Sequence, residues 1–444
     1  MLKYTILLIG TALILAVSWG CDDRGTGIEP VDLGDLENWT GYDPSSAHVF
    51  AGPLTLQLRN PHEQLLGSVY FPPEAISIPP QHTMPLLVLL APEGGNRFYY
   101  FQAGLSELIR ELTASGEIQP MVVYCMSNDM TFGGYFYGDS KPAGHYDSIF
   151  QYTPGDGNDD LLEYLHRFYP STIQSAGKRG IGGIGQGAYG AFRAIIKNPG
   201  VYSSISVTDG PLDFNGLTSL FDDALAEQHA HYALNPELDT SGTPLPFDFR
   251  RDFDSSLMMP ISQMFIGGAL AFSPDDTAIT YDRDVDCTVN PTTDSVFCIL
   301  SLDTLVQERI SDTLTDSSTF ISNLIKSGVK TRYLELDFHL PFDATGAVYN
   351  PIWDRWMANN LENMHEAVGG SPLADVNMWF GSNPGAKWGY YNMTQSWIDY
   401  CRTQGYSVEE YKYSSYTNDP VTGDEYLFDI LREMLIFHSN SFGD

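Results

Sequence analysis

The sequence predicts an α/β fold with a mainly parallel sheet flanked by helices. Continuous apolar runs at residues 84–90, 121–125 and 179–184 are typical of strands buried on both faces of such a sheet. Segments with helical apolar spacing separate these runs, and the alternation favours parallel strands joined by crossover helices. With 43% hydrophobic and 13% aromatic residues, the 444-residue chain can bury a sizeable core.

The expected elements follow in chain order. Residues 48–70 alternate between apolar and polar and predict antiparallel edge strands. The predicted strands of the parallel sheet are 84–90, 121–125, 179–184, 203–207, 376–380 and 408–413. The predicted helices are 103–115, 161–168, 188–197, 394–404 and 426–438.

Two insertions interrupt this alternation. Residues 217–259 are helical in part and rich in proline, and residues 282–333 are acidic with a helical pattern over 304–325. In doubly wound sheets, insertions lie in loops at the carboxyl ends of strands and cover the ligand crevice. Both are therefore expected to be cap elements over the site.

The N-terminus has the organisation of an export signal. Lys3 precedes an apolar run from Ile6 to Val17, which is too short for a permanent membrane-spanning helix. The segment Ser18-Trp19-Gly20-Cys21 resembles a bacterial lipobox, and this implies that Cys21 is lipidated and begins the mature protein. An ordinary secretory signal cleaved near Gly20 is the alternative.

The rest of the chain follows from this assignment. Residues 1–20 are the predicted signal peptide, residues 21–47 a flexible tether rich in Asp, Gly and Pro, and residues 48–444 the folded domain. The expected location is the bacterial cell envelope, where the lipid anchor holds the protein in the periplasm or on the surface.

The net charge of −33 arises from 56 acidic and 23 basic residues. It argues against nucleic acid or an anionic lipid surface as a partner, because phosphates would be repelled. The alternative to a solvated acidic surface is calcium binding at residues 156–159 or 282–286, neither of which completes an EF-hand loop. His229 and His231, two apart, do not make a metal pair, and neither a metal nor a cofactor is expected.

Two of the five cysteines suggest a disulfide. Cys287 and Cys298 lie on either side of the turn-forming residues 290–294, and in an oxidising compartment this spacing suits a local bridge across a hairpin. Cys125 lies in a predicted strand and Cys401 in a predicted helix, so both are expected to be buried free thiols.

The most informative segment is Gly183-Ile184-Gly185-Gln186-Gly187, between a predicted strand and a predicted helix. A serine hydrolase carries Gly-x-Ser-x-Gly at such a turn, where close backbone packing requires small residues. The flanking glycines meet this requirement. Gly185, however, stands at the position of the nucleophile, and a residue without a side chain cannot attack a carbonyl.

The same glycines allow a second interpretation. Gly185-x-Gly187-x-x-Gly190 has dinucleotide-binding spacing, and Asp209 ends the next predicted strand, where that motif expects an acidic residue. The motif lies deep in the chain rather than in its first strand-helix unit, and an exported protein would have little access to nicotinamide cofactors. The hydrolase interpretation therefore explains more of the chain.

Further motifs occur in a recognisable order from about His48 to the C-terminus. They are a strand and glycine loop at 86–95, a loop at 137–146, Asp-Gly-Pro-Leu-Asp-Phe at 209–214, and segments at 271–274, 340–343 and 353–356. Their order resembles that of α/β-hydrolases of the bacterial esterase D-like group, related to antigen 85 and S-formylglutathione hydrolase. The resemblance implies an α/β-hydrolase fold with cap insertions.

The sequence differs from this family at the positions of the catalytic residues. The resemblance implies Ser at Gly185, an acid at Pro384, and a His in the loop 414–420, where Asn418 marks the position and no His occurs. A triad works only as a mutually hydrogen-bonded set, so the loss of all three members predicts abandoned hydrolysis.

We therefore expect an esterase-like binding protein that holds a small molecule, a glycan or a protein partner in the capped crevice. The candidate binding residues of the elbow, the oxyanion loop and the cap are Gln186, Glu93, Gly94, Tyr137 and His339. Aromatic residues at 99–101 and 135–137 would either stack on sugars or pack in the core. The alternatives are a carboxylesterase with relocated catalytic residues, for which His339 is the first histidine to test, and a dinucleotide-binding protein.

The lipobox assignment predicts the behaviour of Cys21→Ser. Without the thiol there is no site for the lipid, so the variant should accumulate as unprocessed or soluble protein. Membrane fractionation and intact mass measure both properties. Fractionation and mass identical to those of the wild type would rule out a lipid at Cys21.

Overall fold

The chain divides into two compact units, Met1–Asp43 and Pro44–Asp444. The computed structural model describes residues of the second unit, namely 48–50, 56–57, 64–65, 67–72, 84–128, 134, 136–140, 144–151, 161–162, 165, 176–234, 260–274, 280–284, 320–321, 325–327, 330–336, 339–343, 345–413 and 424–443. The predicted signal peptide and tether, Cys21, Cys287, Cys298 and Asn418 lie outside the described residues.

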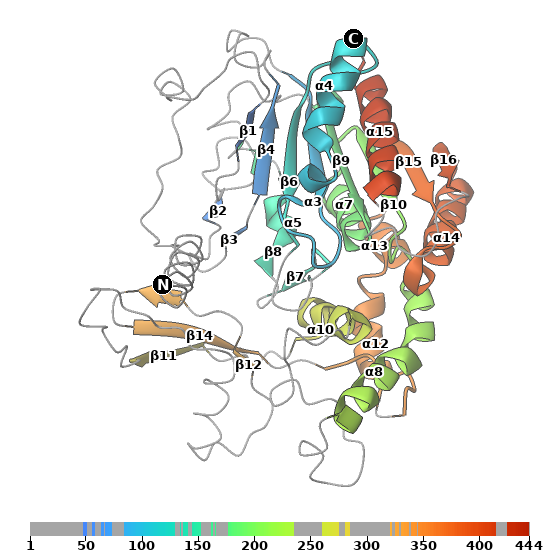
Figure 1. Ribbon diagram of the computed structural model, residues 1–444. Helices are drawn as coiled ribbons and strands as arrows, with labels where there is room; N and C mark the ends of the chain where they lie inside the picture. The colour runs from blue at the N-terminus through green and yellow to red at the C-terminus, as the bar shows by residue number, and fades with distance from the viewer. Residues whose placement is uncertain are drawn as a thin grey trace, which may run out of the picture. The chain divides into compact units, whose positions relative to one another are not determined.

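An eight-stranded sheet forms the centre of the second unit, in the order β1-β4-β6-β5-β9-β10-β15-β16 (Figure 1). The strands are β1 (His48–Phe50), β4 (Gly67–Phe71), β6 (Val122–Met126), β5 (Leu86–Leu90), β9 (Arg179–Ile184), β10 (Ser204–Thr208), β15 (Asn377–Ser382) and β16 (Val408–Lys412). The pairs β1–β4 and β4–β6 are antiparallel, and every pair from β6 to β16 is parallel. The predicted mainly parallel sheet is confirmed.

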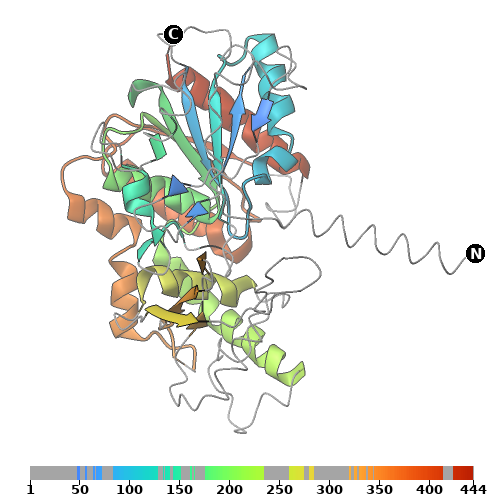
Figure 2. The ribbon, with the colours of Figure 1, turned by 90° about the vertical axis from the view of Figure 1, so that its left-hand side faces the viewer.

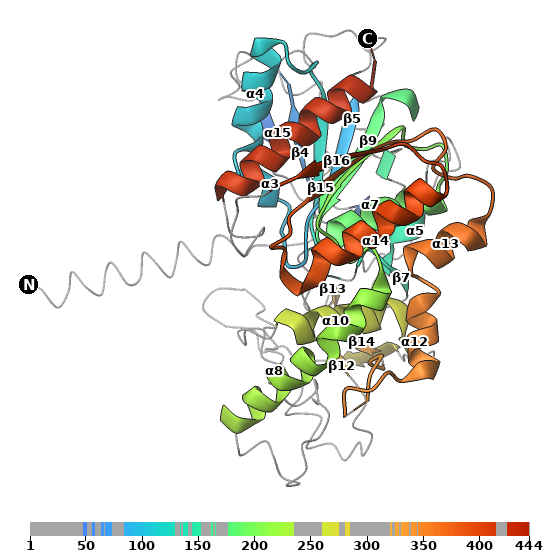
Figure 3. The same cartoon turned by 90° about the vertical axis from the view of Figure 1, so that its right-hand side faces the viewer.

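Both faces of the sheet are covered, as the continuous apolar runs predict. Leu86, Val88 and Leu90 of β5 pack in one hydrophobic cluster, and Leu87 and Leu89 pack in the other. Helices α4 (Leu105–Ser115) and α15 (Asp424–Ser441) cover one face. Helices α7 (Gln186–Lys197), α13 (Leu361–Val368) and α14 (Tyr390–Thr403) cover the other (Figure 3).

A group of helices lies beyond the carboxyl ends of the parallel strands (Figures 1 and 2). The segment η3 (Phe214–Leu220) follows β10 and continues into α8 (Phe221–Leu234), which packs on α10 (Pro260–Phe272). Helix α12 (Asn350–Met357) belongs to the same group, and both α10 and α12 lie outside the two predicted insertions. The limits proposed for the two insertions, 217–259 and 282–333, stay predictions.

Several further elements are short. They are α3 (Tyr99–Gln102), α5 (Tyr146–Ile149), η2 (Ala176–Lys178), η4 (Lys387–Gly389), the paired strands β2 (Leu56–Gln57) and β3 (Gln64–Leu65), and the pair β7 (Asp139–Ser140) and β8 (Gly144–His145). Among the described helices, none combines the length and apolarity needed to cross a membrane. Cys125 and Cys401 are buried free thiols, as predicted.

One predicted helix is wrong at its carboxyl end. The helical pattern over 304–325 runs into β12 (Phe320–Ile321) and the start of β13 (Ile325–Ser327), both of which pair antiparallel with β14 (Lys330–Leu336). Strand β11 (Thr280–Asp284) pairs with the same strand. Aromatic and β-branched residues favour a strand once a partner strand is present, and this tertiary pairing overrides the local periodicity.

A histidine near the end of the chain is part of the core. His438 of α15 is fully buried, and its ring lies between two hydroxyls of β10. The Nδ1 atom is 2.8 Å from Oγ of Ser204, and Nε2 is 2.7 Å from Oγ of Ser206. Gly180 of β9 makes room for the ring, because a Cβ atom there would overlap Nδ1. Burial lowers the pKa of His438 to about 3, so the ring is neutral at pH 7.

This buried histidine predicts acid sensitivity. In the unfolded chain a histidine titrates near pH 6.5, so below that pH protons bind the unfolded state preferentially. The contribution of His438 is fully present above that value and is lost as the pH falls toward 3, by about 1.4 kcal/mol per pH unit. Urea unfolding between pH 7 and 4 measures the slope.

The variant His438→Gln should flatten that slope while lowering stability at pH 7, because it removes the titrating ring and disturbs its hydrogen bonds. His229→Gln, at an exposed position of α8, is the matched control and should keep the wild-type slope. A steep slope retained in His438→Gln would show that other groups cause the acid sensitivity.

Candidate functional site

The predicted elbow is a tight turn between a strand and a helix. Strand β9 ends at Ile184, α7 begins at Gln186, and Gly185 between them has φ 58° and ψ −126°. Side chains reach such a positive φ only at a cost. The turn is also tightly packed, because a Cβ atom at Gly187 would overlap the carbonyl oxygen of Leu90. The small residues in this motif thus have the steric role expected of them.

The carboxylate of Glu93 lies over this turn. Its Oε2 atom accepts a hydrogen bond from the backbone N–H of Gln186 at 3.0 Å. A Cβ atom at position 185 would overlap the same oxygen. The carboxylate therefore occupies the place where a nucleophile's side chain would begin, and it engages the amide directly after that position.

The electrostatics of the turn suit a carboxylate. The Gln186 amide belongs to the first turn of α7, where unpaired N–H groups and the helix dipole favour negative charge. A hydrogen bond to an ionised acceptor is also stronger than one between neutral groups. Burial, with a smaller contribution from the charge of Glu93, raises the pKa of Tyr137 and of Tyr390, so both phenols are neutral at pH 7.

The other candidates from the elbow region face inward. The buried side chain of Gln186 accepts hydrogen bonds from Asn128 Nδ2 at 3.1 Å and from the N–H of Phe136 at 3.2 Å. The buried Tyr137 donates its hydroxyl to the carbonyl of Ala91 at 2.8 Å. Glu93, Gln186 and Tyr137 therefore belong to one region, where the last two hold the loops that follow β5 and β6.

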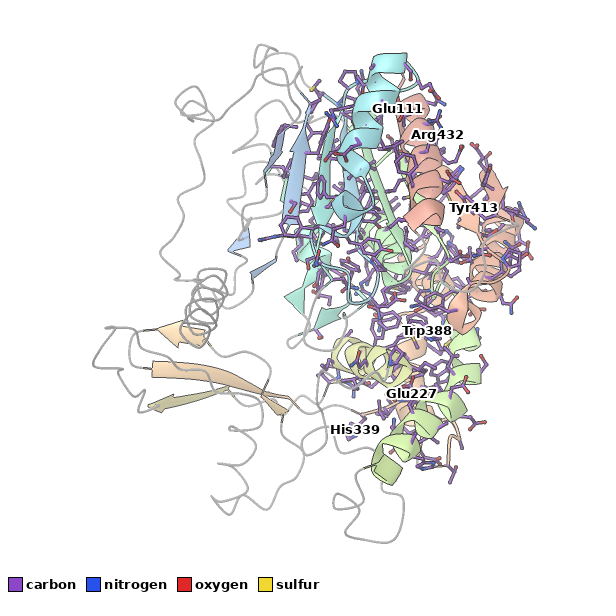
Figure 4. The ribbon with its side chains drawn as sticks, viewed as in Figure 1. Glu111, Glu227, His339, Trp388, Tyr413 and Arg432 are labelled. Carbon is purple, nitrogen blue, oxygen red and sulfur yellow. The ribbon has the colours of Figure 1, made fainter. Side chains whose placement is uncertain are left out.

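Two further candidates lie differently. Gly94, at the tip of the loop after β5, is exposed and has φ 69°. His339 is exposed in the cap region, where its carbonyl accepts a hydrogen bond from Ser273 Oγ at 2.6 Å. Figure 4 shows His339 beyond α10, on the side away from the sheet. The structure does not bring His339 to the elbow.

The region expected to carry an acid holds a different carboxylate. Pro384 is exposed after β15, and the preceding Asn383 donates its N–H to Oδ1 of Asp209 at 3.0 Å. Asp209 is buried at the end of β10 and has φ 37°. From the sequence, Asp209 is expected as the acidic residue of the dinucleotide alternative and as the first residue of the motif at 209–214. The Asp-Gly pair at the end of a predicted strand is the local signal that marks it.

The dinucleotide alternative conflicts with the elbow as it stands. In that interpretation a pyrophosphate would rest on the N-terminus of α7. Glu93 places its carboxylate there, in contact with the Gln186 amide. A phosphate would meet both the volume and the negative charge of this side chain.

Aromatic rings pack between α7 and the cap helices. The ring of Phe136, buried with φ 54°, lies 5.8 Å from Tyr189, 5.9 Å from Phe214, 5.5 Å from Phe272 and 6.2 Å from Trp356. All of these side chains are buried. Phe136 is therefore a core residue, and its ring is not exposed for stacking on a sugar.

An ion pair between the buried Arg193 and the half-buried Asp147 fixes the rest of α7. Arg193 donates from Nε and Nη2 to the two carboxylate oxygens of Asp147, each at 2.8 Å, and from Nη1 to Oδ1 of Asn359 at 2.8 Å. Tyr189 donates to the carbonyl of the same asparagine at 2.6 Å. Helix α7 is thus tied to α5 and to the connection between α12 and α13. Within the described part of the chain, no three acidic, His or Cys side chains are grouped as a metal site.

The variant Gly185→Ser tests how closely Glu93 fills the elbow. The new Cβ must displace the carboxylate from the Gln186 amide, and the backbone must keep a positive φ. We expect the free energy of unfolding to fall by about 3 kcal/mol, from a lost charge-assisted hydrogen bond and backbone strain. Urea unfolding followed by tryptophan fluorescence measures the loss.

Gly200→Ser is the matched control. Gly200 also has a positive φ, 78°, but a Cβ atom there meets no atom within 4 Å. It should lose only about 1 kcal/mol, the cost of the backbone conformation. Equal losses in the two variants would contradict a close contact between position 185 and Glu93.

No protein-family model matches the sequence, and no curated protein is significantly similar to it. Among solved structures, a ferulic acid esterase is 13% identical with a TM-score of 0.46, covering 90% of this chain and 99% of that chain. A fluorophosphonate-binding serine hydrolase F of Staphylococcus aureus is 10% identical with a TM-score of 0.42, covering 89% and 99%. An S-formylglutathione hydrolase from Agrobacterium tumefaciens is 12% identical with a TM-score of 0.40, covering 89% and 95%.

At these identities the likeness concerns the fold alone. The order of the eight strands, the change from antiparallel to parallel pairing at β6, and the turn between β9 and α7 provide the structural argument. These features, with helices on both faces of the sheet, are those of the α/β-hydrolase fold. The chain has the α/β-hydrolase fold that the sequence predicts.

Proposed function

We propose that this chain is an exported, lipid-anchored member of the esterase D-like group that binds a ligand without hydrolysing it. The observation that carries the proposal is the position of Glu93. An acyl-transfer site needs a nucleophile and free N–H donors for the oxyanion. Here residue 185 has no side chain, and the Gln186 amide already holds a carboxylate.

The positions of the acid and the base support the same proposal. Pro384 cannot act as an acid, and the loop 414–420 contains no His. The buried Asp209 carboxylate accepts a hydrogen bond from the N–H of Asn383, the residue after β15, so it lies beside the end of that strand. Because the sequence of 414–420 contains no His, this segment supplies no imidazole for such a carboxylate to orient.

Two buried histidines of the described chain have other surroundings. His438 of α15 lies between Ser204 and Ser206 of β10. This is the face of the sheet that α15 covers, opposite the face covered by α7. His365 of α13 is held by two tyrosines, with Nε2 2.7 Å from the Tyr406 hydroxyl and Nδ1 3.0 Å from the Tyr400 hydroxyl. Neither ring is placed to take a proton from a group at the elbow.

The proposed ligand is a small molecule, a glycan or a protein partner bound near the carboxyl ends of the parallel strands. The exposed Gly94 and the segment from Pro384 to Gly389 lie on loops at those ends. The net charge of −33 disfavours nucleic acid as the partner. A lipid on Cys21 would hold the domain at the cell envelope through the tether.

Hydrolysis by the purified mature protein tests the proposal. With p-nitrophenyl butyrate the rate should stay at that of the same protein unfolded in urea, because no activated hydroxyl is present at the elbow. A fluorophosphonate probe, which labels activated serines, should leave the intact mass unchanged. A serine hydrolase assayed in parallel serves as the positive control.

Saturable hydrolysis or stoichiometric labelling would contradict the proposal and favour a carboxylesterase with relocated catalytic residues. Peptide mapping of the labelled serine would then locate the nucleophile. Loss of that activity in His339→Ala would identify its base.

A further inference from the structure

We propose that Glu93 is a built-in occupant of a carboxylate-binding site at the elbow, and that this site takes the carboxylate of a ligand when the Glu93 side chain is withdrawn. The inference rests on the proposed function, because it assumes that the elbow binds rather than hydrolyses. It adds the chemical class of the ligand, a carboxylic acid, and the side chain that controls access to it.

The receiving group is the N–H of Gln186 at the start of a 12-residue helix. The amide is already bound to a carboxylate, with 3.0 Å between the nitrogen and Oε2 of Glu93. The group bound at this amide is a carboxylate, so a carboxylate is the ligand group that we expect the amide to bind. A ligand carboxylate offers the same planar pair of acceptor oxygens and would replace it atom for atom.

The loop that carries Glu93 is built to hold it there. The N–H of Gly95 donates to the carbonyl of Pro92 at 2.9 Å, and Gly94 between them has the positive φ that such a tight turn requires. The N–H of Asn128 then donates to the carbonyl of Gly95 at 2.8 Å, which ties the turn to the segment after β6. Glu93 therefore extends from a fixed turn toward the elbow.

The occupant and the glycine below it are complementary. Only a residue without Cβ at position 185 leaves the volume that Oε2 fills. A nucleophile in that volume would exclude the carboxylate, and the carboxylate excludes a nucleophile. The exchange of Ser for Gly and the presence of Glu in the oxyanion loop thus act as one structural change, which converts a site for a carbonyl oxygen into a site for a carboxylate.

Binding of butyrate to three variants tests the inference, measured by isothermal titration calorimetry on the full mature protein at pH 7. Glu93→Ala removes the occupant and should bind butyrate at least about tenfold more tightly than the wild type, as expected for one charge-assisted hydrogen bond. Glu93→Gln keeps an oxygen that can accept from the same amide but lacks the charge, so it should tighten butyrate binding less than Glu93→Ala does. Glu107→Ala, at an exposed position of α4, is the matched control and should behave as the wild type.

Two results would overturn the inference. A folded Glu93→Ala that binds butyrate no better than the wild type would show that the amide is not a carboxylate site. Equal tightening in Glu93→Gln and Glu93→Ala would show that charge repulsion, rather than occupation, keeps anions away. If Glu93→Ala does not fold, Glu93→Asp takes its place, because the shorter side chain draws the carboxylate back from the amide.

A double-mutant cycle with Gly185→Ala supplies a second measurement that needs no ligand. Alanine at 185 should shift the urea midpoint down in the wild type and shift it less in the Glu93→Ala background, because the clash is gone. Additive shifts would overturn the complementarity of the two positions. Ester hydrolysis by the wild type would instead defeat the proposed function while leaving this coupling intact, so the two failures are distinguishable.

Discussion

Close backbone packing where α7 leaves β9 is the constraint on which the rest of the site depends. Gly187 lies against the carbonyl of Leu90, so the first turn of the helix sits directly beside the end of β5. This approach brings the loop after β5 to the Gln186 amide. It also leaves no room for a larger residue at the turn, and the first N–H group of the helix meets the Glu93 carboxylate of that loop.

What the loop supplies is a carboxylate. In acyl transfer, such an amide stabilises negative charge that develops on a carbonyl oxygen. With Glu93 in contact, the same donor binds a carboxylate oxygen, and the glycine at 185 provides the space. Under the proposed function, the elbow keeps the geometry of the fold, and its amide holds a stable anion instead of a transient oxyanion.

Buried polar pairs on both faces of the sheet keep this region in place. On the α7 face, the Arg193–Asp147 pair and Asn359 tie the helix to its neighbours. On the other face, His438 joins α15 to β10 through Ser204 and Ser206. Each group is hydrogen-bonded, and a buried polar network of this kind specifies one arrangement of the elements because any other would leave its members unpaired.

The sequence by itself determined the α/β class, the mainly parallel sheet and the elbow at residues 183–187. These features rest on local patterns: apolar runs of strand length, helical spacing and small residues at a tight turn. Only the tertiary structure decided what each polar side chain contacts. Glu93 and Gln186 are 93 residues apart, and His438 and Ser204 are 234 apart, so no local pattern relates them. Such hydrogen bonds depend on strand order and helix packing. These bring together residues that are far apart in the chain, and the local sequence around each residue does not predict the contact.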